Sequence, residues 1–193
     1  MRDQDRLHAA MLRPAGPSSD FDLNPSIVLP PDRILRPAAV LVAVWQDELV
    51  LTKRASHLKH HPGQIAFPGG KVDPGDASAT AAALREAHEE IGLRSDTVEV
   101  LGALPVHETV TGFSVTPILG RIKTGFVAVP EAGEVDEVFT VPLAHVLDPS
   151  RYAIEGRLWR GSWRRYYAIP YGPYYIWGAT ARILRGLAER ASQ

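Results

Sequence analysis

Three glutamates lie within five positions of one stretch of this chain, just after a pair of glycines. The stretch runs from Phe67 to Leu93 and reads FPGGKVDPGDASATAAALREAHEEIGL. Its alanine-rich run favours an α-helix, and an advance of about 100° per residue brings Glu86 and Glu90 together on one helix face. Like charges at this i,i+4 spacing repel each other. The pattern therefore predicts a cation that makes the arrangement favourable.

Mg²⁺ or Mn²⁺ is the expected cation, because both prefer oxygen ligands and bind carboxylates together with phosphate oxygens of a substrate. We expect Glu86, Glu89 and Glu90 to supply the carboxylates. The backbone carbonyl of Gly70 is expected to reach the same ion, since glycine lacks a Cβ. Arg85 is expected to orient one of the glutamates. The plain alternative, a solvated acidic helix face, explains neither the glycine pair nor the arginine.

A basic cluster precedes the glycines, and it consists of Lys53, Arg54, Lys59, His60 and His61. The whole chain carries 21 basic and 22 acidic side chains, so the cluster is a local feature. A polyanionic ligand such as a phosphate ester would be bound by such a cluster. The alternative is a set of solvated loop side chains. A metal site at the two histidines would need a third nitrogen ligand at suitable spacing.

The elements around these residues follow from apolar spacing and turn signals. The central helix is expected to begin after an N-cap at Asp76 and to end at Gly92, with His88 at the edge of its apolar stripe. That stripe is predicted to comprise Thr80, Leu84, Ala87 and Ile91, with Glu86 and Glu90 on nearly the opposite face. Strands are predicted within 38–45, 49–54, 97–110, 114–123, 137–141 and 157–170, and helices at Asp3–Leu12 and within 174–192. The mixture predicts a single α/β domain.

Composition limits the remaining possibilities. Residues 1–37 are rich in proline and are predicted to form an N-terminal extension, with the folded domain at 38–193. The near-zero net charge gives no indication of nucleic-acid or membrane binding. The absence of cysteine excludes disulfides and thiolate chemistry. A charged N-terminus and the lack of a long apolar run lead us to expect a cytoplasmic protein.

The spacing within the glutamate stretch resembles a known signature. Gly70, Asp76, Arg85, Glu86, Glu89, Glu90, Gly92 and Leu93 resemble the Nudix box, G-x5-E-x7-R-E-U-x-E-E-x-G-U. Asp76 stands where the box has glutamate, and eight residues rather than seven separate it from Arg85. The resemblance implies a metal-dependent hydrolase of nucleoside diphosphates linked to another group, and a Nudix-type α/β/α sandwich with a mixed sheet.

The segment upstream of the box is similar to the extra motif of the coenzyme A pyrophosphatase branch, L-L-T-x-R-S-x3-R-x3-G-x3-F-P-G-G. Ala55 replaces the motif's serine and Lys59 its second arginine; the matching residues are Leu51, Thr52, Arg54, Gly63, Phe67, Pro68, Gly69 and Gly70. This resemblance implies hydrolysis of coenzyme A to 3′,5′-ADP and 4′-phosphopantetheine. Lys53, Arg54, Lys59 and Phe67 are then the expected substrate-binding residues. The alternatives are a Nudix pyrophosphatase acting on ADP-ribose, NADH or a nucleoside triphosphate, and a binding module without catalysis.

The sequence allows more than one role for two further groups of residues. Glu134 and Glu137 are candidates for an additional base, with Glu108 as the alternative, and each is also compatible with a plain surface role. The C-terminal aromatics Trp159, Trp163, Tyr166 and Tyr174 are compatible with a stacking wall for adenine, with core packing or with a homodimer contact.

Overall fold

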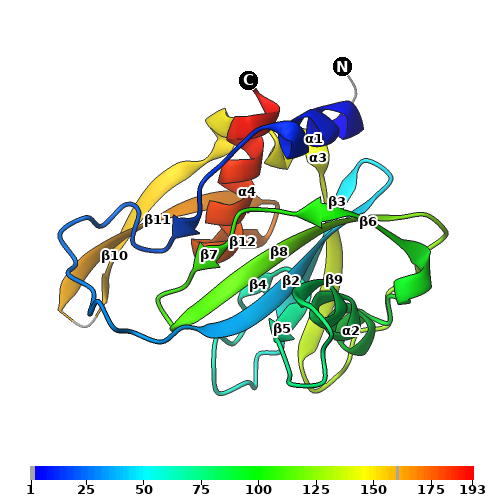
Figure 1. The fold of residues 1–193 in the computed structure, drawn as a ribbon, viewed down its shortest axis with the longest axis horizontal. Helices are drawn as coiled ribbons and strands as arrows, with labels where there is room; N and C mark the ends of the chain where they lie inside the picture. The colour runs from blue at the N-terminus through cyan, green and yellow to red at the C-terminus, as the bar shows by residue number, and fades with distance from the viewer. Residues whose placement is uncertain (1–2, 160) are drawn as a thin grey trace.

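The computed structural model describes residues 3–159 and 161–193. A mixed sheet forms its centre, with strands in the order β1-β7-β8-β2-β3-β4 and with β5 beside β2, β6 beside β8 and β9 beside β3 (Figure 1). The strands of this sheet are β1 (Ser18–Ser19), β2 (Arg36–Trp45), β3 (Glu48–Arg54), β4 (Ile65–Ala66), β5 (Gly69–Lys71), β6 (Val98–Ala103), β7 (His107–Glu108), β8 (Phe113–Ile122) and β9 (Val135–Pro142). β2 runs parallel to β8 and antiparallel to β3.

A second sheet of three antiparallel strands comes from the C-terminal part of the chain. Its strands are β10 (Ala153–Trp159), β11 (Ser162–Tyr171) and β12 (Tyr174–Trp177). The helices are α1 (Asp3–Leu12), α2 (Ala79–Ile91), the short α3 (Leu143–Val146) and α4 (Gly178–Ala191), with 3-10 turns at Ser95–Thr97 and Pro149–Arg151. Among the residues described, no helix is long and apolar enough to cross a membrane.

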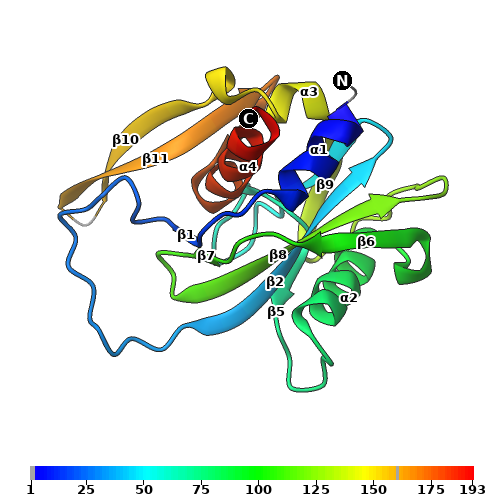
Figure 2. The same ribbon diagram turned by 45° about the horizontal axis from the view of Figure 1, so that its top comes forward.

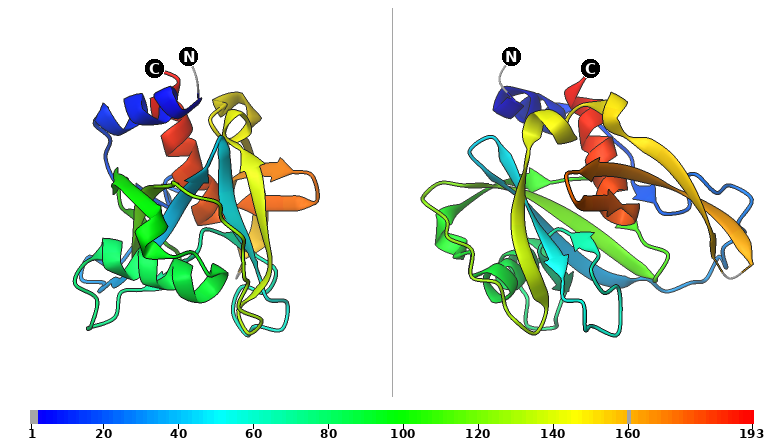
Figure 3. Two further views of the ribbon diagram at one scale, coloured as in Figure 1. Left: turned by 90° about the vertical axis from the view of Figure 1, so that its right-hand side faces the viewer. Right: turned by 180° about the vertical axis from the view of Figure 1, so that it is seen from behind.

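β2 is apolar on both faces because each face is covered by helix. Ala39, Leu41 and Ala43 point to a core shared with α2, whereas Val42 and Val44 point to a larger core shared with α1 and α4. Side chains alternate along a strand, so one continuous apolar run serves both cores. Figure 2 shows α2 on one side of the main sheet and α1 with α4 on the other, and Figure 3 shows the same layers from two further sides.

The N-terminal residues take part in this arrangement. Leu7 and Ala10 of α1 are buried in the core that contains α4. β1 adds a short parallel strand next to β7. The two ends of the chain therefore lie side by side, as Figures 1 and 3 show. The sequence-based helix at Asp3–Leu12 is confirmed, and the boundary at residue 37 stays a prediction.

Three local expectations were wrong. The N-cap of α2 is Ser78, whose Oγ accepts the Ala81 N–H at 3.1 Å, because Asp76 is held elsewhere. The first residues of the predicted C-terminal helix form β12, since they pair with β11. The buried side of α2 consists of Ala82, Ala83, Ala87, Glu90 and Ile91, and Thr80 and Leu84 are only partly buried.

Candidate functional site

The glycine turn at β5 lies directly against the carboxylates of α2. The backbone N–H of Gly69 donates to Glu90 Oε2 at 3.0 Å. Glu90 is 5% exposed, so its carboxylate is covered by the turn, and the alternative of a solvated acidic helix face does not hold for this residue. A Cβ placed on Gly70 would lie 2.5 Å from Glu86 Oε1. A residue with a side chain at this position would displace that carboxylate, which explains the glycine physically.

Arg85 holds the acidic side chains in place. Its Nη1 donates to Glu86 Oε1 at 2.9 Å and to Glu89 Oε2 at 3.0 Å. Its Nε and Nη2 each lie 3.0 Å from an oxygen of Asp76, so this pair is bidentate. The Asp76 carboxylate also accepts the Asp73 N–H, at 2.8 Å. Asp76 therefore anchors Arg85. Because its carboxylate is occupied in this way, Asp76 does not cap α2.

Burial makes negative charge costly at this site. Burial, together with the negative charges of Glu86 and Glu134, raises the pKa of Glu90 to about 7 against the opposing Gly69 N–H and Arg54 charge. Burial is also the largest cause that raises the pKa of Glu86, although its bond to Arg85 opposes the effect. Two neighbouring carboxylates that both resist ionisation form a site that a nearby positive charge would stabilise.

The donor set fits a hard divalent cation. Among the described residues, no three histidine, aspartate or glutamate side chains already form a group that would hold a metal ion. Glu89 in particular turns to Arg85, and its side chain is 56% exposed. Glu86, Glu90 and the backbone of the glycine turn nevertheless offer only oxygen acceptors and one N–H in a half-buried space. Such a set suits Mg²⁺ or Mn²⁺ rather than a softer metal.

The basic residues of the upstream segment divide into two groups. Arg54, at the end of β3, lies close enough to oppose the rise in the pKa of Glu90. Lys53 and His61 line a cavity beside it. Lys59 and His60 are exposed and line neither of the two cavities on this side of the protein. The structure thus brings only part of the predicted basic cluster toward the carboxylates.

Two adjoining cavities lie beside the second sheet. One has a volume of about 310 Å³ and is lined by Phe67, Arg157, Arg164, Tyr166 and Trp177, among others. The other has a volume of about 630 Å³ and includes Lys53, Glu137 and Tyr174. Both share His61, Gln64, Arg157 and Trp177 in their linings. Sequence reasoning missed Arg157, Arg164 and Trp177, because they come from a distant hairpin and strand and have no local motif.

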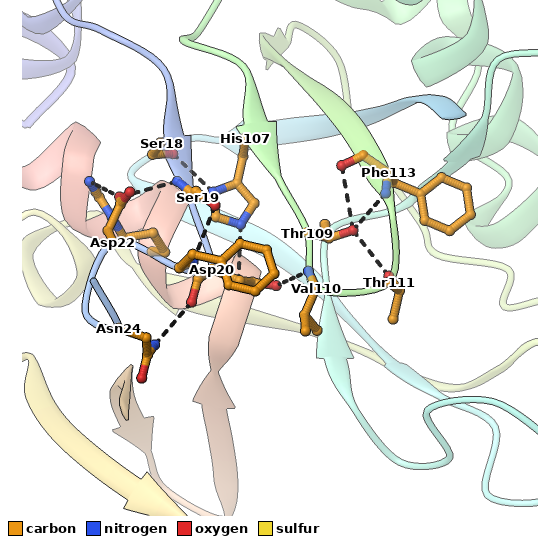
Figure 4. Close-up of polar contacts among 12 residues, drawn as sticks. Ser18, Ser19, Asp20, Asp22, Asn24, His107, Thr109, Val110, Thr111 and Phe113 are labelled. Atoms are coloured by element: carbon orange, nitrogen blue, oxygen red, sulfur yellow. Dashed lines mark hydrogen bonds and ion pairs between the residues drawn. The ribbon is translucent and has the colours of Figure 1, made fainter. Parts of the chain in front are cut away.

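A buried histidine fixes one wall of the smaller cavity. Ser18 Oγ lies 2.9 Å from His107 Nδ1, and His107 Nε2 lies 3.1 Å from Asp20 Oδ1 (Figure 4). The other oxygen of Asp20 accepts the Val110 N–H at 2.8 Å. His107 is completely buried, so this serine–histidine–aspartate arrangement holds the N-terminal segment against the 109–111 loop. Val110 and its two threonine neighbours line the cavity.

The candidate additional bases lie in different surroundings. Glu137 lines the larger cavity and accepts a hydrogen bond from the Tyr174 hydroxyl. Glu134 is exposed, but its charge raises the pKa of both Glu86 and Glu90. Glu108 forms a bidentate ion pair with Arg33, with both N–O distances at 2.7 Å.

The C-terminal aromatic side chains have separate environments. Tyr166 lines the smaller cavity, and Tyr174 stacks on Phe139 with ring centroids 3.6 Å apart. Trp163 is 72% exposed. The side chain of Trp159 lies outside the described residues.

A mixed sheet between helical layers, with a glycine turn set against the carboxylates of one helix, defines the Nudix fold. The family model described as NUDIX domain matches residues 35–158. The chain therefore belongs to the Nudix family, which confirms the predicted single-domain α/β fold. Nudix hydrolases act on small-molecule substrates and generally use divalent ions such as Mg²⁺ or Mn²⁺.

A relative found by sequence agrees with this assignment. The chain is 48% identical over 156 residues to a protein of Enterobacter sp. (strain 638) described as uncharacterized Nudix hydrolase NudL, covering 79% of this chain and 81% of the relative. A NUDIX hydrolase from Nitrosomonas europaea matches with a TM-score of 0.49 and 18% identity over 61% of this chain and 63% of that one. An Ap4A hydrolase from C. elegans matches with a TM-score of 0.48 and 21% identity, covering 55% and 80%.

Proposed function

We propose that this Nudix hydrolase cleaves the pyrophosphate of coenzyme A and its derivatives, releasing 3′,5′-ADP and 4′-phosphopantetheine. The observation that carries the proposal is the bond from Gly69 N–H to Glu90. It joins the upstream coenzyme A-type segment, which ends in the FPGG turn, to the glutamates of α2. The segment that distinguishes this branch is thus part of the wall of the acidic site.

Glu86 and Glu90, with Glu89 and the backbone carbonyl of Gly70, would hold Mg²⁺ or Mn²⁺. When bound, such an ion supplies positive charge for the pyrophosphate oxygens and a coordinated water of lowered pKa. Arg85 binds both Glu86 and Glu89 and is itself anchored on Asp76, so it would fix the positions of these two carboxylates. These residues contribute chiefly by positioning and electrostatic stabilisation.

The residues around the acidic site orient the substrate. Arg54 offers a guanidinium beside Glu90, suited to a phosphate oxygen of the scissile group. Phe67 is 4% exposed and forms part of the smaller cavity, so it would contact a substrate bound there. Lys53 would add charge from the larger cavity. Lys59, which is exposed, would act only at the outer end of a bound molecule.

An in-line attack of water on phosphorus breaks the P–O–P linkage and requires a proton acceptor. Glu137 is our first candidate, because it lines the larger cavity next to Lys53 on the neighbouring strand. Glu134 is the second, since its charge acts on both Glu86 and Glu90. A Glu137→Gln variant should lose activity most strongly if the first assignment is right. If only the Glu134→Gln variant loses activity, Glu134 rather than Glu137 is the proton acceptor.

The test is incubation with Mg²⁺ or Mn²⁺ and a panel of coenzyme A, ADP-ribose, NADH and diadenosine tetraphosphate, with the products separated by chromatography. We expect 4′-phosphopantetheine to form faster than any product of the other three compounds. Rapid cleavage of another compound without 4′-phosphopantetheine would overturn the substrate assignment and leave the hydrolase class intact. The same protein run on a sizing column tests the homodimer alternative for the C-terminal aromatic residues.

A further inference from the structure

Two arginines occupy paired positions on the β10–β11 hairpin. Arg157 and Arg164 are direct partners in the antiparallel register, and both line the cavity of about 310 Å³. Side chains of such partners leave the same face of the sheet, with Cβ atoms roughly 5 Å apart, and like charges placed this way destabilise the pair. An anion between the two guanidinium groups reverses the sign of that interaction.

The other charged groups of this cavity favour the same kind of ligand. The titratable residues in its lining are Asp20, His61, Arg157, Arg164, Arg165 and Tyr166. Among the described lining residues, Asp20 is the one carboxylate, and both its oxygens are already bonded, to His107 and to the Val110 N–H. Burial, followed by the positive charges of Arg54, His60 and Arg157, lowers the pKa of His61. The cavity is therefore a local positive region in a chain of net charge −1.

The cavity also offers a flat apolar surface beside the arginines. The Arg157 guanidinium lies over the Trp177 ring, 4.8 Å from its centroid. Tyr166 meets Trp177 edge-on, with centroids 5.1 Å apart and an interplanar angle of 61°. These contacts hold the arginine in place before a ligand arrives, which lowers the entropic cost of binding. A phosphate attached to a planar ring system would match both the charge and the flat apolar surface.

Phe67 and Arg54 relate this cavity to the acidic site. Phe67 lines the cavity and lies two residues before Gly69, which bonds to Glu90. Arg54 acts electrostatically both on Glu90 and on His61. A single ligand extending from the carboxylates into the cavity would thus meet positive charge along its length.

We propose that the arginine-pair cavity binds a second phosphate of the substrate, a monoester carried by the nucleoside, separately from the scissile pyrophosphate. The inference rests on the proposed function, in which the substrate carries such a 3′-phosphate beside adenine. The opposite, pantetheine end of that substrate is neutral and offers no anionic group to the two arginines of this cavity. Arg157 and Arg164 thereby make the enzyme prefer a 3′-phosphorylated nucleotide.

The direct test is calorimetric titration of the metal-free protein with 3′,5′-ADP and with 5′-AMP, which differ by the 3′-phosphate alone. The wild-type protein should bind 3′,5′-ADP roughly ten- to a hundredfold more tightly, as expected for charge-assisted hydrogen bonds. Arg157→Gln and Arg164→Gln should each remove most of that preference. Arg151→Gln is the matched control, because this exposed arginine pairs with Asp148 and lies outside the cavity lining.

Equal binding of the two nucleotides by the wild-type protein, or a preference that survives in both cavity variants, would overturn the inference. Kinetics with coenzyme A and with dephospho-coenzyme A separate it from the proposed function. If neither compound is cleaved, the proposed function fails, and the nucleotide titration still decides the role of the cavity. If both are cleaved, Arg157→Gln should lower kcat/KM for coenzyme A alone, and an equal loss with both compounds would contradict the assignment.

Discussion

Replacing Glu90 with glutamine should stabilise the metal-free protein above pH 7 while abolishing activity. Glu90 is 5% exposed and lies beside Glu86, and its pKa is raised to about 7 from an ordinary 4.5. Between those values the folded protein keeps a proton that the unfolded chain has released. Folding stability therefore falls as pH rises from about 4.5 to about 7 and loses nothing further from this group at higher pH.

The size of the effect follows from the same values. One pKa unit corresponds to about 1.4 kcal/mol, so ionising the buried Glu90 costs about 3 kcal/mol of folding free energy at pH 8. Glutamine keeps an oxygen for the Gly69 N–H and carries no charge, so the variant avoids this cost. For a chain of this length the difference corresponds to roughly 10 °C in Tm.

Urea unfolding of both proteins in EDTA, at several values between pH 5 and pH 8, measures this difference. The free energies of unfolding of the two proteins should be close near pH 5, and toward pH 8 the Glu90→Gln variant should become the more stable. Both proteins contain the same histidines, so the contributions of these residues cancel in the difference. Adding Mn²⁺ at pH 8 should raise the stability of the wild-type protein more than that of the variant. A difference that stays constant across the pH range would refute buried negative charge at Glu90 as its source.

Three further substitutions test individual contacts. Gly70→Ala should reduce activity at least tenfold with a small change in Tm, because its Cβ would lie 2.5 Å from Glu86 Oε1; normal steady-state rates would contradict the close approach. Arg85→Lys loses the bidentate grip on Asp76 and should cost about 1–3 kcal/mol in urea unfolding; unchanged stability would show that a single charge suffices. Asn24→Ala removes two hydrogen bonds to the β11 backbone, of 2.8 and 2.9 Å, and should cost a similar amount in thermal unfolding; an unaltered Tm would show that water replaces them.

The local part of the fold was predictable from the sequence. Apolar runs and turn residues gave β2, β3 and β8, because a strand buried on both faces has few polar positions. The i,i+4 spacing of Glu86 and Glu90 predicted that both glutamates lie on one face of α2. The sequence prediction placed the N-cap of α2 at Asp76, whereas the structure has Ser78 there. The outcome depended on Arg85, which binds Asp76 from a later turn of the helix.

The surroundings of the site were not predictable, because they depend on contacts between distant segments. Helical geometry alone placed Glu90 on an exposed face, whereas β5 folds over it. Ser18, Asp20 and His107 carry no motif and meet only after the N-terminal segment pairs with β7. Arg157 becomes a cavity residue only because the β10–β11 hairpin comes close to the 61–67 segment. Register and long-range packing decide such cases, and single-sequence patterns do not contain them.

The central claim is tested most directly by the rate of 4′-phosphopantetheine formation from coenzyme A as Mg²⁺ or Mn²⁺ is added to the metal-free protein. The wild-type rate should rise from zero to saturation and return to zero with EDTA. A folded Glu86→Gln variant should be slower by orders of magnitude at every ion concentration. Product formation that persists in EDTA, or that is unchanged in the variant, would contradict the proposed site.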